Sequence, residues 1–527
     1  MMTSPDLAQP RWFTSPRLLL ILFSVLLVVA LVPLTVARIM PLADYPNHIA
    51  RIYILQHAAQ SPVLSRYYIP FIHFQPNLAF DLAVLWLGKI FPLWTAGSIF
   101  AAISFVTIVS GVVALNRTLH RQWSLWPCLA FLLLYNRLFL WGFIGYLFTL
   151  GVALWGIAAW HAFRNKSMGV RLVVGAAFAF AVYIGHLFAF GFYGLVLAAL
   201  VGHLAWKKWR DDRPLVLREA VIAFVPFIVP IAIFFFVSPT GQAGQSTFWG
   251  GLTRSVTAPF NIVQNYNMPV DALTFLVFVV LFAFLFLRRR LQVSIASLTA
   301  FCVLALVQLA MPDKLFSSYS ADHRLPIAIA LFAIAVSQPR IRSEFWFRLG
   351  VVAVISLFLV RMAIIVDVWR QADARYQPYE QALAKLPVGA RISTVVVNGG
   401  ATWLPAIPVF EIGCLAILSR DAFVANLFAY PKDAGQSVAF TPAYVPVQTA
   451  ATYHIFAPMD FDLMRSPAGS KFGFRPMRAA EIGYFDYYLV INPKEYGLPL
   501  PPNVHLEQRG PDFNIYRVDH THSNTGI

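Results

Sequence analysis

The sequence has few charged residues and few cysteines. Only 12% of its 527 residues are Asp, Glu, Lys or Arg, whereas soluble domains contain about 25%. A larger soluble core does not explain the difference, because long soluble chains divide into domains that each need a polar surface. The three cysteines have no metal-ligand spacing and are too few for a disulfide framework. These absences favour a protein whose apolar surface faces lipid.

Motifs of several enzyme classes are also missing. The sequence contains no phosphate-binding P-loop, so it gives no support to ATP-driven transport. It contains neither GxSxG nor HExxH, which disfavours membrane hydrolases of those two kinds. The net charge of +16 does not indicate a nucleic-acid partner, because the Lys and Arg residues lie between apolar runs. Basic residues in such places anchor a protein to the inner leaflet of a lipid bilayer.

Hydrophobic residues make up 59% of the chain. They gather in runs that approach the roughly 20 residues needed to cross a bilayer. We therefore expect a multi-span α-helical membrane protein with about 11 spans, in a range of about 10–13. The first run lacks a convincing cleavage site, so we interpret it as an uncleaved span. The expected spans are residues 17–37, 95–115, 123–141, 142–160, 171–187, 188–205, 216–237, 271–287, 291–311, 324–338 and 345–367.

Basic residues in the short loops predict how the chain threads through the membrane. If these loops are cytoplasmic, the N-terminus is cytoplasmic and everything after Val368 lies on the outer face. This solution requires the short apolar stretch 79–92 to lie at the interface instead of crossing. We therefore expect a transmembrane domain at 1–368, with a first outer loop at 38–94, and a C-terminal domain at 369–527.

The C-terminal segment differs in character from the rest of the chain. Short runs of β-type residues occur at 392–397, 487–491 and 513–518, and Pro and Gly residues separate them. Such a pattern predicts strands connected by turns. We expect a small α/β domain outside the cytoplasm.

The stretch at 41–51, PLADYPNHIAR, follows the first span directly. Asp44 precedes a predicted helix, and Asn47, His48 and Arg51 lie within about one turn of each other. Asp44 can act as a general base or as a metal ligand, and Arg51 can hold a phosphate by a bidentate contact. The alternatives are that Asp44 only caps the helix, that Arg51 reaches towards lipid phosphates, and that His48 is structural.

A second group of polar residues lies where a later apolar run begins. It contains Lys314, Asp322, His323 and Arg324. Ionisable residues at membrane depth are costly, which makes them candidates for function. His323 and Arg324 can bind a lipid phosphate. The alternative is a surface ion pair between Asp322 and Arg324.

Four further polar residues are predicted at the outer edge of the membrane. They are candidate substrate-binding residues: Asn136, Arg137, His186 and Arg254. Arg137 can instead be a headgroup anchor, and His186 can instead form a hydrogen bond between helices. The segment around Arg254 is either an ordered cover over a cleft or a flexible connector.

This layout resembles the GT-C superfamily of integral membrane glycosyltransferases. Members have a first span, an outer loop with an essential acidic residue, a bundle of spans and often an outer C-terminal domain. The Asp44 stretch is similar to that loop in bacterial mannosyl-, arabinosyl- and aminoarabinosyltransferases. Many members have two adjacent acidic residues, but here Tyr45 follows Asp44, so a divalent cation is allowed and not required. The aromatic-aromatic-Asp signature of oligosaccharyltransferases is absent, which argues against protein N-glycosylation.

The resemblance implies a polyprenyl-phosphate-sugar donor, a glycan or glycolipid acceptor, a hexose or pentose as the sugar, and a bacterial inner membrane with the C-terminal domain in the periplasm. Asp44 would deprotonate the acceptor, and transfer would invert the anomeric configuration. The groups that would stabilise the departing phosphate are Arg51, Arg137, Lys314, His323 and Arg324.

Two other classes of function remain open from the residues alone. The first is a transporter or flippase for a lipid-linked glycan, and the second is a non-catalytic membrane scaffold. The candidate polar residues are predicted at one depth, and no inverted repeat is visible, which argues against a transporter.

Overall fold

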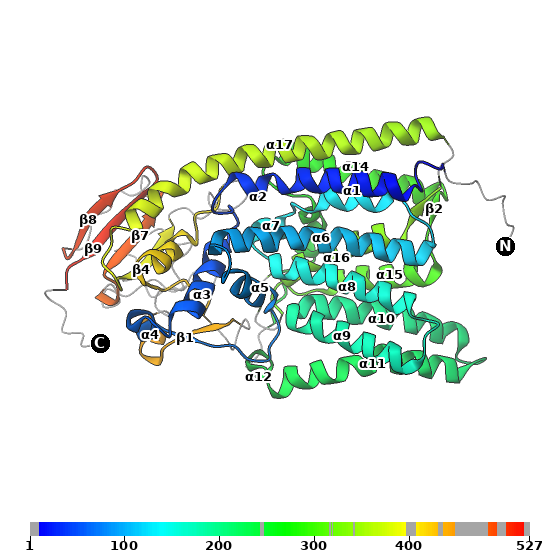
Figure 1. Ribbon diagram of the computed structural model, residues 1–527, viewed down its shortest axis with the longest axis horizontal. Coiled ribbons are helices and arrows are strands. Elements are labelled where there is room, and N and C mark those ends of the chain that lie inside the picture. The colour runs from blue at the N-terminus through cyan, green and yellow to red at the C-terminus, as the bar shows by residue number, and fades with distance from the viewer. Residues whose placement is uncertain are drawn as a thin grey trace.

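Long apolar helices that run side by side dominate the computed structural model (Figure 1). It describes residues 10–242, 247–315, 318, 320–340, 343–396, 407–429, 436–447, 483–492 and 502–520. In this part of the chain, eight segments are long and apolar enough to cross a membrane. They are α1 with α2 (Pro16–Leu31 and Pro33–Val36), α6 (Leu93–His120), α8 (Ile144–Ala162), α9 (Met168–Gly185), α10 (Leu187–Lys208), α11 (Arg213–Phe236), α14 (Met268–Leu287) and α17 (Glu344–Leu383).

Three of the expected spans correspond to shorter helices. The run at 123–141 forms η1 (Trp126–Leu133) and α7 (Arg137–Trp141), and the other two form α15 (Ile295–Ala310) and α16 (Ala321–Val336). The multi-span membrane class is confirmed, and the count of about 11 crossings stays a prediction.

The apolar stretch at 79–92 contains a helix too short to cross a bilayer. This helix, α5 (Ala79–Leu87), has nine residues and is therefore roughly 13 Å long. The hydrocarbon core of a bilayer is roughly 30 Å thick. The structure agrees with the interpretation that this stretch does not span.

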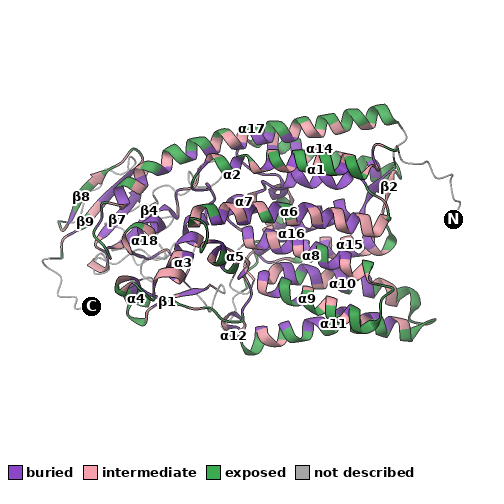
Figure 2. Cartoon of the chain, viewed as in Figure 1, coloured by how far each residue is buried: buried purple, intermediate pink, exposed green. Residues whose placement is uncertain are grey.

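Small residues let the two central helices of the bundle approach closely. A Cβ atom on Gly111 of α6 would lie 2.8 Å from the carbonyl oxygen of Gly151 in α8. Close backbone approach of this kind stabilises helix pairs in lipid, where apolar burial gives little driving force. Figure 2 shows exposed residues along the outer helices α11 and α17, where lipid would cover the apolar ones.

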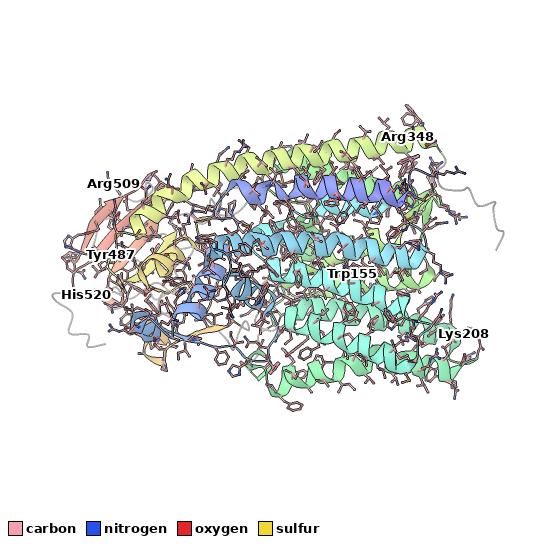
Figure 3. The ribbon with its side chains drawn as sticks, in the orientation of Figure 1. Trp155, Lys208, Arg348, Tyr487, Arg509 and His520 are labelled. Atoms are coloured by element: carbon pink, nitrogen blue, oxygen red, sulfur yellow. The ribbon has the colours of Figure 1, made fainter. Side chains whose placement is uncertain are left out.

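The basic loops between the spans lie at one end of the bundle, and the small domain lies at the other (Figure 1). Figure 3 shows Lys208 and Arg348 at one end of the bundle, and Tyr487, Arg509 and His520 in the small domain at the other end. Basic residues lie at the C-terminal ends of α6, α10 and α14 or directly after them. These helix ends also point away from the small domain (Figure 1). The basic residues of the loops between the spans therefore gather at one end of the bundle (Figure 1), as the loop analysis predicts.

The remaining short elements connect the spans. On the side of the small domain they are α3 (Tyr45–His57), α4 (Pro62–Tyr67), β1 (Tyr68–Pro70), α12 (Pro239–Gln242), α13 (Leu252–Thr257) and η2 (Ala258–Ile262). At the opposite end, β2 (Leu291–Gln292) pairs antiparallel with β3 (Gln338–Pro339).

A five-stranded sheet forms the core of the C-terminal domain. Its strand order is β5-β4-β7-β9-β8; β4 pairs in parallel with β5 and β7, and β9 pairs antiparallel with β7 and β8. The strands are β4 (Arg391–Val396), β5 (Phe423–Val424), β7 (Tyr487–Ile491), β8 (Val504–Arg509) and β9 (Phe513–Val518). The helical turns are η4 (Ile412–Cys414), α18 (Leu415–Arg420) and η5 (Pro442–Tyr444). The predicted α/β character is confirmed, although Val397 lies outside the described residues.

The first outer loop and the C-terminal domain pack together. β1 of the loop pairs antiparallel with β6 (Val438–Phe440) of the domain, so that Tyr68 faces Phe440 and Pro70 faces Val438. Helix α17 has 40 residues and runs without interruption from the bundle into the domain (Figure 1). Residues far apart in sequence therefore meet at the boundary between bundle and domain.

Candidate active site

The backbone around Asp44 is fixed against the end of α7. The N–H groups of Ala43 and Asp44 donate hydrogen bonds to the carbonyl oxygens of Leu140 (2.9 Å) and Trp141 (3.0 Å). Gly142 follows with φ of +103°, and a Cβ atom on it would lie 2.9 Å from Asp44 Cβ. A glycine is needed at this position for its conformation and for the close approach of Asp44.

We expect Gly142→Ala to lower the midpoint of thermal unfolding in detergent. The left-handed conformation costs a non-glycine residue roughly 1–2 kcal/mol, and the contact with Asp44 adds strain. Gly145→Ala is the matched control: its new Cβ would have 3.5 Å to the nearest atom, and alanine is favoured in a helix. An unchanged midpoint for Gly142→Ala would contradict this packing.

Asp44 occupies the N-cap position of α3, but its carboxylate makes no capping hydrogen bond. Asp44 therefore has the position of a capping residue, but its side chain does not perform the capping function. Burial raises the pKa of Asp44 to about 7, and the positive charges of Arg51 and Arg324 oppose this rise. A carboxyl group with a pKa near neutrality is suited to accept a proton at physiological pH. The structure also brings the two predicted polar groups together, because the positive charge of Arg324 opposes the rise that burial causes in the pKa of Asp44.

Arg51 is buried in the site and does not face lipid. Its Nη2 lies 2.6 Å from Oδ1 of Asp81 in α5, and both side chains are 3% exposed. Ser437 of the C-terminal domain donates a hydrogen bond to the other carboxylate oxygen of Asp81. In the described structure, Nε and Nη1 of Arg51 have no hydrogen-bond partner. These two N–H groups are available to an anionic or hydroxylated ligand.

His48 contributes a neutral ring to the wall of the site. Its ring centroid lies 5.2 Å from that of Phe80 and 6.3 Å from that of Phe428. Burial, together with the charge of Arg51, holds the pKa of His48 well below its usual value. A neutral imidazole adds no positive charge for a phosphate.

Asn47 attaches α3 to the C-terminal domain. Its Nδ2 donates to Oε2 of Glu411 and to the carbonyl oxygen of Asn426, both at 2.9 Å, and its Oδ1 accepts from the N–H of Phe428 at 2.8 Å. All these partners are protein groups, so Asn47 fixes the geometry of the site. It does so three residues after Asp44.

Glu411 is an acidic residue of the site that the sequence analysis missed. Its side chain is buried, and burial, together with the charge of Asp44, raises its pKa to about 8. Oε2 accepts hydrogen bonds from Asn47 and Asn426, whereas Oε1 has no partner in the described part of the chain. The only sequence signal was a lone acid in the apolar stretch Val-Phe-Glu-Ile at 409–412.

Arg324 of α16 is a buried cation held between aromatic rings. Its guanidinium carbon lies 4.7 Å from the ring centroid of Phe143 and 4.4 Å from that of Phe188. Nη1 donates to Ser318 Oγ at 3.0 Å, and Nε has no partner among the described groups. Stacking on aromatic faces holds a guanidinium in place while its N–H edge stays available to an anion.

Asp322 pairs with Arg254 and not with Arg324. Arg254 Nε lies 2.7 Å from Asp322 Oδ2, and its Nη2 lies 2.5 Å from Asp313 Oδ1. The proposed surface pair between Asp322 and Arg324 is therefore wrong, because Asp322 is buried and the 247–257 segment supplies its cation. His323 bonds to Asn261 of η2. These contacts favour an ordered cover over a flexible connector around Arg254.

Asn136 and His186 act as helix caps. Oδ1 of Asn136 accepts from the N–H groups of Leu138 (2.9 Å) and Phe139 (3.1 Å) at the start of α7. Nδ1 of His186 accepts from the N–H of Phe188 at 3.2 Å at the start of α10. Both side chains have clear structural roles, and their predicted substrate contacts stay predictions.

Arg137 and Lys314 bond to segments that connect the spans. Arg137 Nη1 donates to Gln264 Oε1 at 2.6 Å, and the guanidinium lies 4.6 Å from the ring centroid of Trp141. Lys314 exchanges backbone hydrogen bonds with Phe248 at 3.0 and 3.1 Å, which fixes the 247–257 segment.

Arg324 also lines an apolar groove. It has a volume of about 360 Å³ and lies between α10, α15 and the first turns of α16. Apolar residues dominate its lining, and Arg324 and Tyr146 are the polar residues among them. A groove with this distribution suits a ligand with a long apolar tail and an anionic head.

The chain resembles known proteins in fold and not in sequence. No protein-family model and no curated protein matches the sequence. Among solved structures, ArnT from Cupriavidus metallidurans bound to undecaprenyl phosphate has a TM-score of 0.53 at 12% identity, over 96% of this chain and 99% of ArnT. The chain shares its fold with ArnT. The apo structure of ArnT gives a TM-score of 0.52 at 12% identity, over 94% and 97% of the two chains. The resemblance to GT-C enzymes is confirmed for the ArnT-like fold, over nearly the whole length.

The described residues of the candidate site do not bring together an evident set of metal ligands. Among the described residues, no group of three or more His, Cys, Asp and Glu side chains is arranged to hold a metal ion. Burial and the charge of Asp44 raise the pKa of Glu411. The charged residues that shift the pKa of Asp44 itself are arginines. The described residues therefore fit a phosphate site better than a metal site.

Proposed function

We propose that this protein is an integral membrane glycosyltransferase that moves a sugar from a polyprenyl-phosphate donor to a hydroxyl group of a glycan or glycolipid. One observation carries the proposal: burial raises the pKa of Asp44 to about 7, the positive charge of Arg324 opposes this rise, and the same Arg324 lines the apolar groove. The prenyl tail would occupy the groove, and the phosphate would lie at Arg324. The ArnT-like fold and the undecaprenyl phosphate bound to ArnT support this choice of donor.

The proposed reaction gives each of the charged groups a role. Asp44 takes the proton of the acceptor hydroxyl, and the oxygen attacks the anomeric carbon of the sugar. A new glycosidic C–O bond forms while the bond from carbon to the phosphate oxygen breaks. Attack from the face opposite the phosphate inverts the configuration. Arg324, with the free N–H groups of Arg51, stabilises the charge that develops on the leaving polyprenyl phosphate.

We further propose a bacterial inner membrane, with the N-terminus in the cytoplasm and the C-terminal domain in the periplasm. The basic residues of the short loops between spans lie at the end away from that domain, as Lys208 does in Figure 3, and this placement supports the orientation. The C-terminal domain then closes the site from outside through Asn47, Glu411 and Ser437. Protease protection of tagged termini in sealed vesicles tests the orientation.

Sugar transfer by the purified protein in lipid tests the function directly. Radiolabelled hexose and pentose donors on polyprenyl phosphate are supplied with a lipid extract as the source of acceptors. Labelled product that depends on the protein supports the proposal. Movement of labelled lipid across vesicle membranes without any transfer would instead show a flippase.

The pH dependence of transfer has a definite sign. Asp44 acts as a base only when ionised, and its pKa is about 7, so kcat/KM should rise from about pH 5.5 and level off above about pH 8. Steady-state rates at saturating donor and limiting acceptor measure this profile. A profile that is flat or falls over the same interval would contradict the role of Asp44.

The sequence leaves a divalent cation possible without requiring one, and chelation tests this point. If the arginines alone neutralise the phosphate, an excess of EDTA leaves transfer unchanged. A loss of transfer that Mg²⁺ or Mn²⁺ restores would show that a metal ion joins the site.

A further inference from the structure

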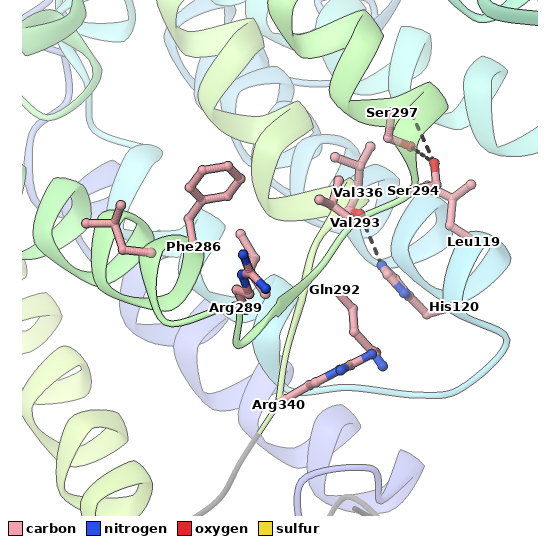
Figure 4. Close-up of a pocket in the computed structure, with 12 residues that line it drawn as sticks. Leu119, His120, Phe286, Arg289, Gln292, Val293, Ser294, Ser297, Val336 and Arg340 are labelled. Carbon is pink, nitrogen blue, oxygen red and sulfur yellow. Dashed lines mark hydrogen bonds between the residues drawn. The ribbon is translucent and has the colours of Figure 1, made fainter. Parts of the chain in front are cut away.

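A second cavity lies at the opposite end of the bundle from Asp44. It has a volume of about 620 Å³ and forms where α6 and α14 end and α15 begins, beside β2 and the residues after β3 (Figure 4). This end carries the basic loops of the chain (Figure 1). The glycosyltransferase reaction proposed above does not use it.

Backbone pairing holds the walls of this cavity in place. Gln292 of β2 pairs with Gln338 of β3, and the N–H of Arg340 donates to the carbonyl oxygen of Arg290 at 2.7 Å. On the far wall, Nε2 of His120 lies 3.2 Å from the carbonyl oxygen of Val336. These bonds join segments from four helices, so the cavity is an ordered part of the structure.

Two guanidinium groups line the cavity, and none of its 12 lining residues carries a carboxylate. Arg289 has φ of +53°, which is unusual for a non-glycine residue. Its side chain reaches the cavity, whereas Arg288 and Arg290 lie over the ring of Phe284, at 6.0 and 5.7 Å. Arg340 is the second cation. The lining therefore favours an anionic ligand.

Hydroxyl groups and a helix start add to this preference for anions. Ser294 Oγ caps α15 by accepting from the N–H of Ser297 at 3.0 Å, and the two hydroxyl groups bond at 2.8 Å. α15 has 16 residues, and the partial positive charge at its N-terminus faces this part of the cavity. Both serines line the cavity (Figure 4).

One rim of the cavity is apolar and faces outward. Phe286 and Leu287 at the end of α14 line the cavity and are 54% and 77% exposed. Because α14 is one of the candidate membrane spans, lipid chains cover this rim. The ligand that matches the cavity has an anionic head beside the arginines and apolar chains along α14.

We propose that this cavity binds the headgroup of an anionic phospholipid in the leaflet opposite the active site. The phosphate accepts hydrogen bonds from Arg289 and Arg340, and the acyl chains lie against Phe286 and Leu287. Basic cavities between transmembrane helices on the cytoplasmic side suit such headgroups. This inference does not depend on the enzymatic function.

Native mass spectrometry of the purified full-length protein tests the inference. The delipidated protein is titrated with phosphatidylglycerol, phosphatidylethanolamine and, separately, inorganic phosphate. We expect phosphatidylglycerol to bind at least about tenfold more tightly than phosphatidylethanolamine. The double variant Arg289→Gln, Arg340→Gln should weaken phosphatidylglycerol binding about 30-fold, as expected for the loss of two basic contacts.

The double variant Arg288→Gln, Arg290→Gln is the matched control, because it removes the same number of positive charges next to the cavity without changing a residue of its lining. It should keep the wild-type affinity, and thermal unfolding checks that all variants are folded. An equal loss of affinity in the control would show that only the general surface charge matters, and it would contradict the proposed site. Equal binding of the two lipids, or full competition by inorganic phosphate at millimolar concentration, would overturn the phospholipid assignment.

Discussion

Asp44→Asn is expected to remove most of the sugar transfer while leaving donor binding intact. Asparagine has nearly the shape of the acid but cannot accept the proton of the acceptor. A general base contributes typically about 10²–10⁴-fold to a rate, so kcat should fall by that factor. Binding of polyprenyl phosphate is measured in parallel and should change little, because the donor needs no base.

The fold should tolerate this substitution. The pKa of Asp44 is raised from 3.8 to about 7 in the folded protein, so the folded state favours its neutral form. The stability linked to that proton is therefore full below about pH 4 and lost as the pH rises through 7. A neutral Asn is not expected to destabilise the protein at pH 7.5.

Asp367→Asn serves as the control for Asp44→Asn. Asp367 is exposed on α17 and bonds only to Gln371 among the described residues, so its loss tests the effect of charge alone. Wild-type turnover by a folded Asp44→Asn protein would refute the role of Asp44 as the base. Equal losses in both variants would point to a general effect of charge.

Arg324→Gln is expected to lower kcat/KM by about 10²–10³-fold, the usual effect of removing one group that stabilises transition-state charge. The loss should appear in both kcat and KM, because the donor phosphate is already charged before reaction. Steady-state kinetics with varied donor concentration separates the two. Tyr146 bonds to the backbone oxygen of Arg324, and this hydrogen bond survives the substitution.

Two further variants sharpen the result at position 324. Arg324→Lys keeps the charge but loses the planar fork and its stacking on Phe143 and Phe188, so its activity should fall between those of wild type and Arg324→Gln. Arg348→Gln, at the far end of the bundle (Figure 3), should behave as wild type. Full activity of Arg324→Gln would move the phosphate site elsewhere.

The regular elements were largely predictable because their signals are local. Apolar runs specified the helices, and the runs at 392–397, 487–491 and 513–518 became β4, β7 and β9. The strands β5, β6 and β8 were missed. β5 and β6 have two and three residues, too few for a periodic pattern, and four of the six residues of β8 are exposed.

The site was predicted only in part, because its partners lie far apart in sequence. Asp44 and Arg51 stood out within one motif, but the pairing of Arg51 with Asp81 depends on α5 folding back over α3. Glu411 and Ser437 enter the site through the C-terminal domain, more than 350 residues away. No local pattern marks such residues.

The sequence by itself determined the membrane class, the helical runs and the α/β character of the C-terminal domain, and it singled out the Asp44 motif as a candidate, because hydrophobicity and short spacing are local properties. Only the tertiary structure decided which charges meet. It raised the pKa of Asp44 by surrounding it with protein, and it paired Asp322 with Arg254 instead of Arg324. Burial and charge contact depend on the distance between side chains, and that distance is set when the helices and the C-terminal domain pack together.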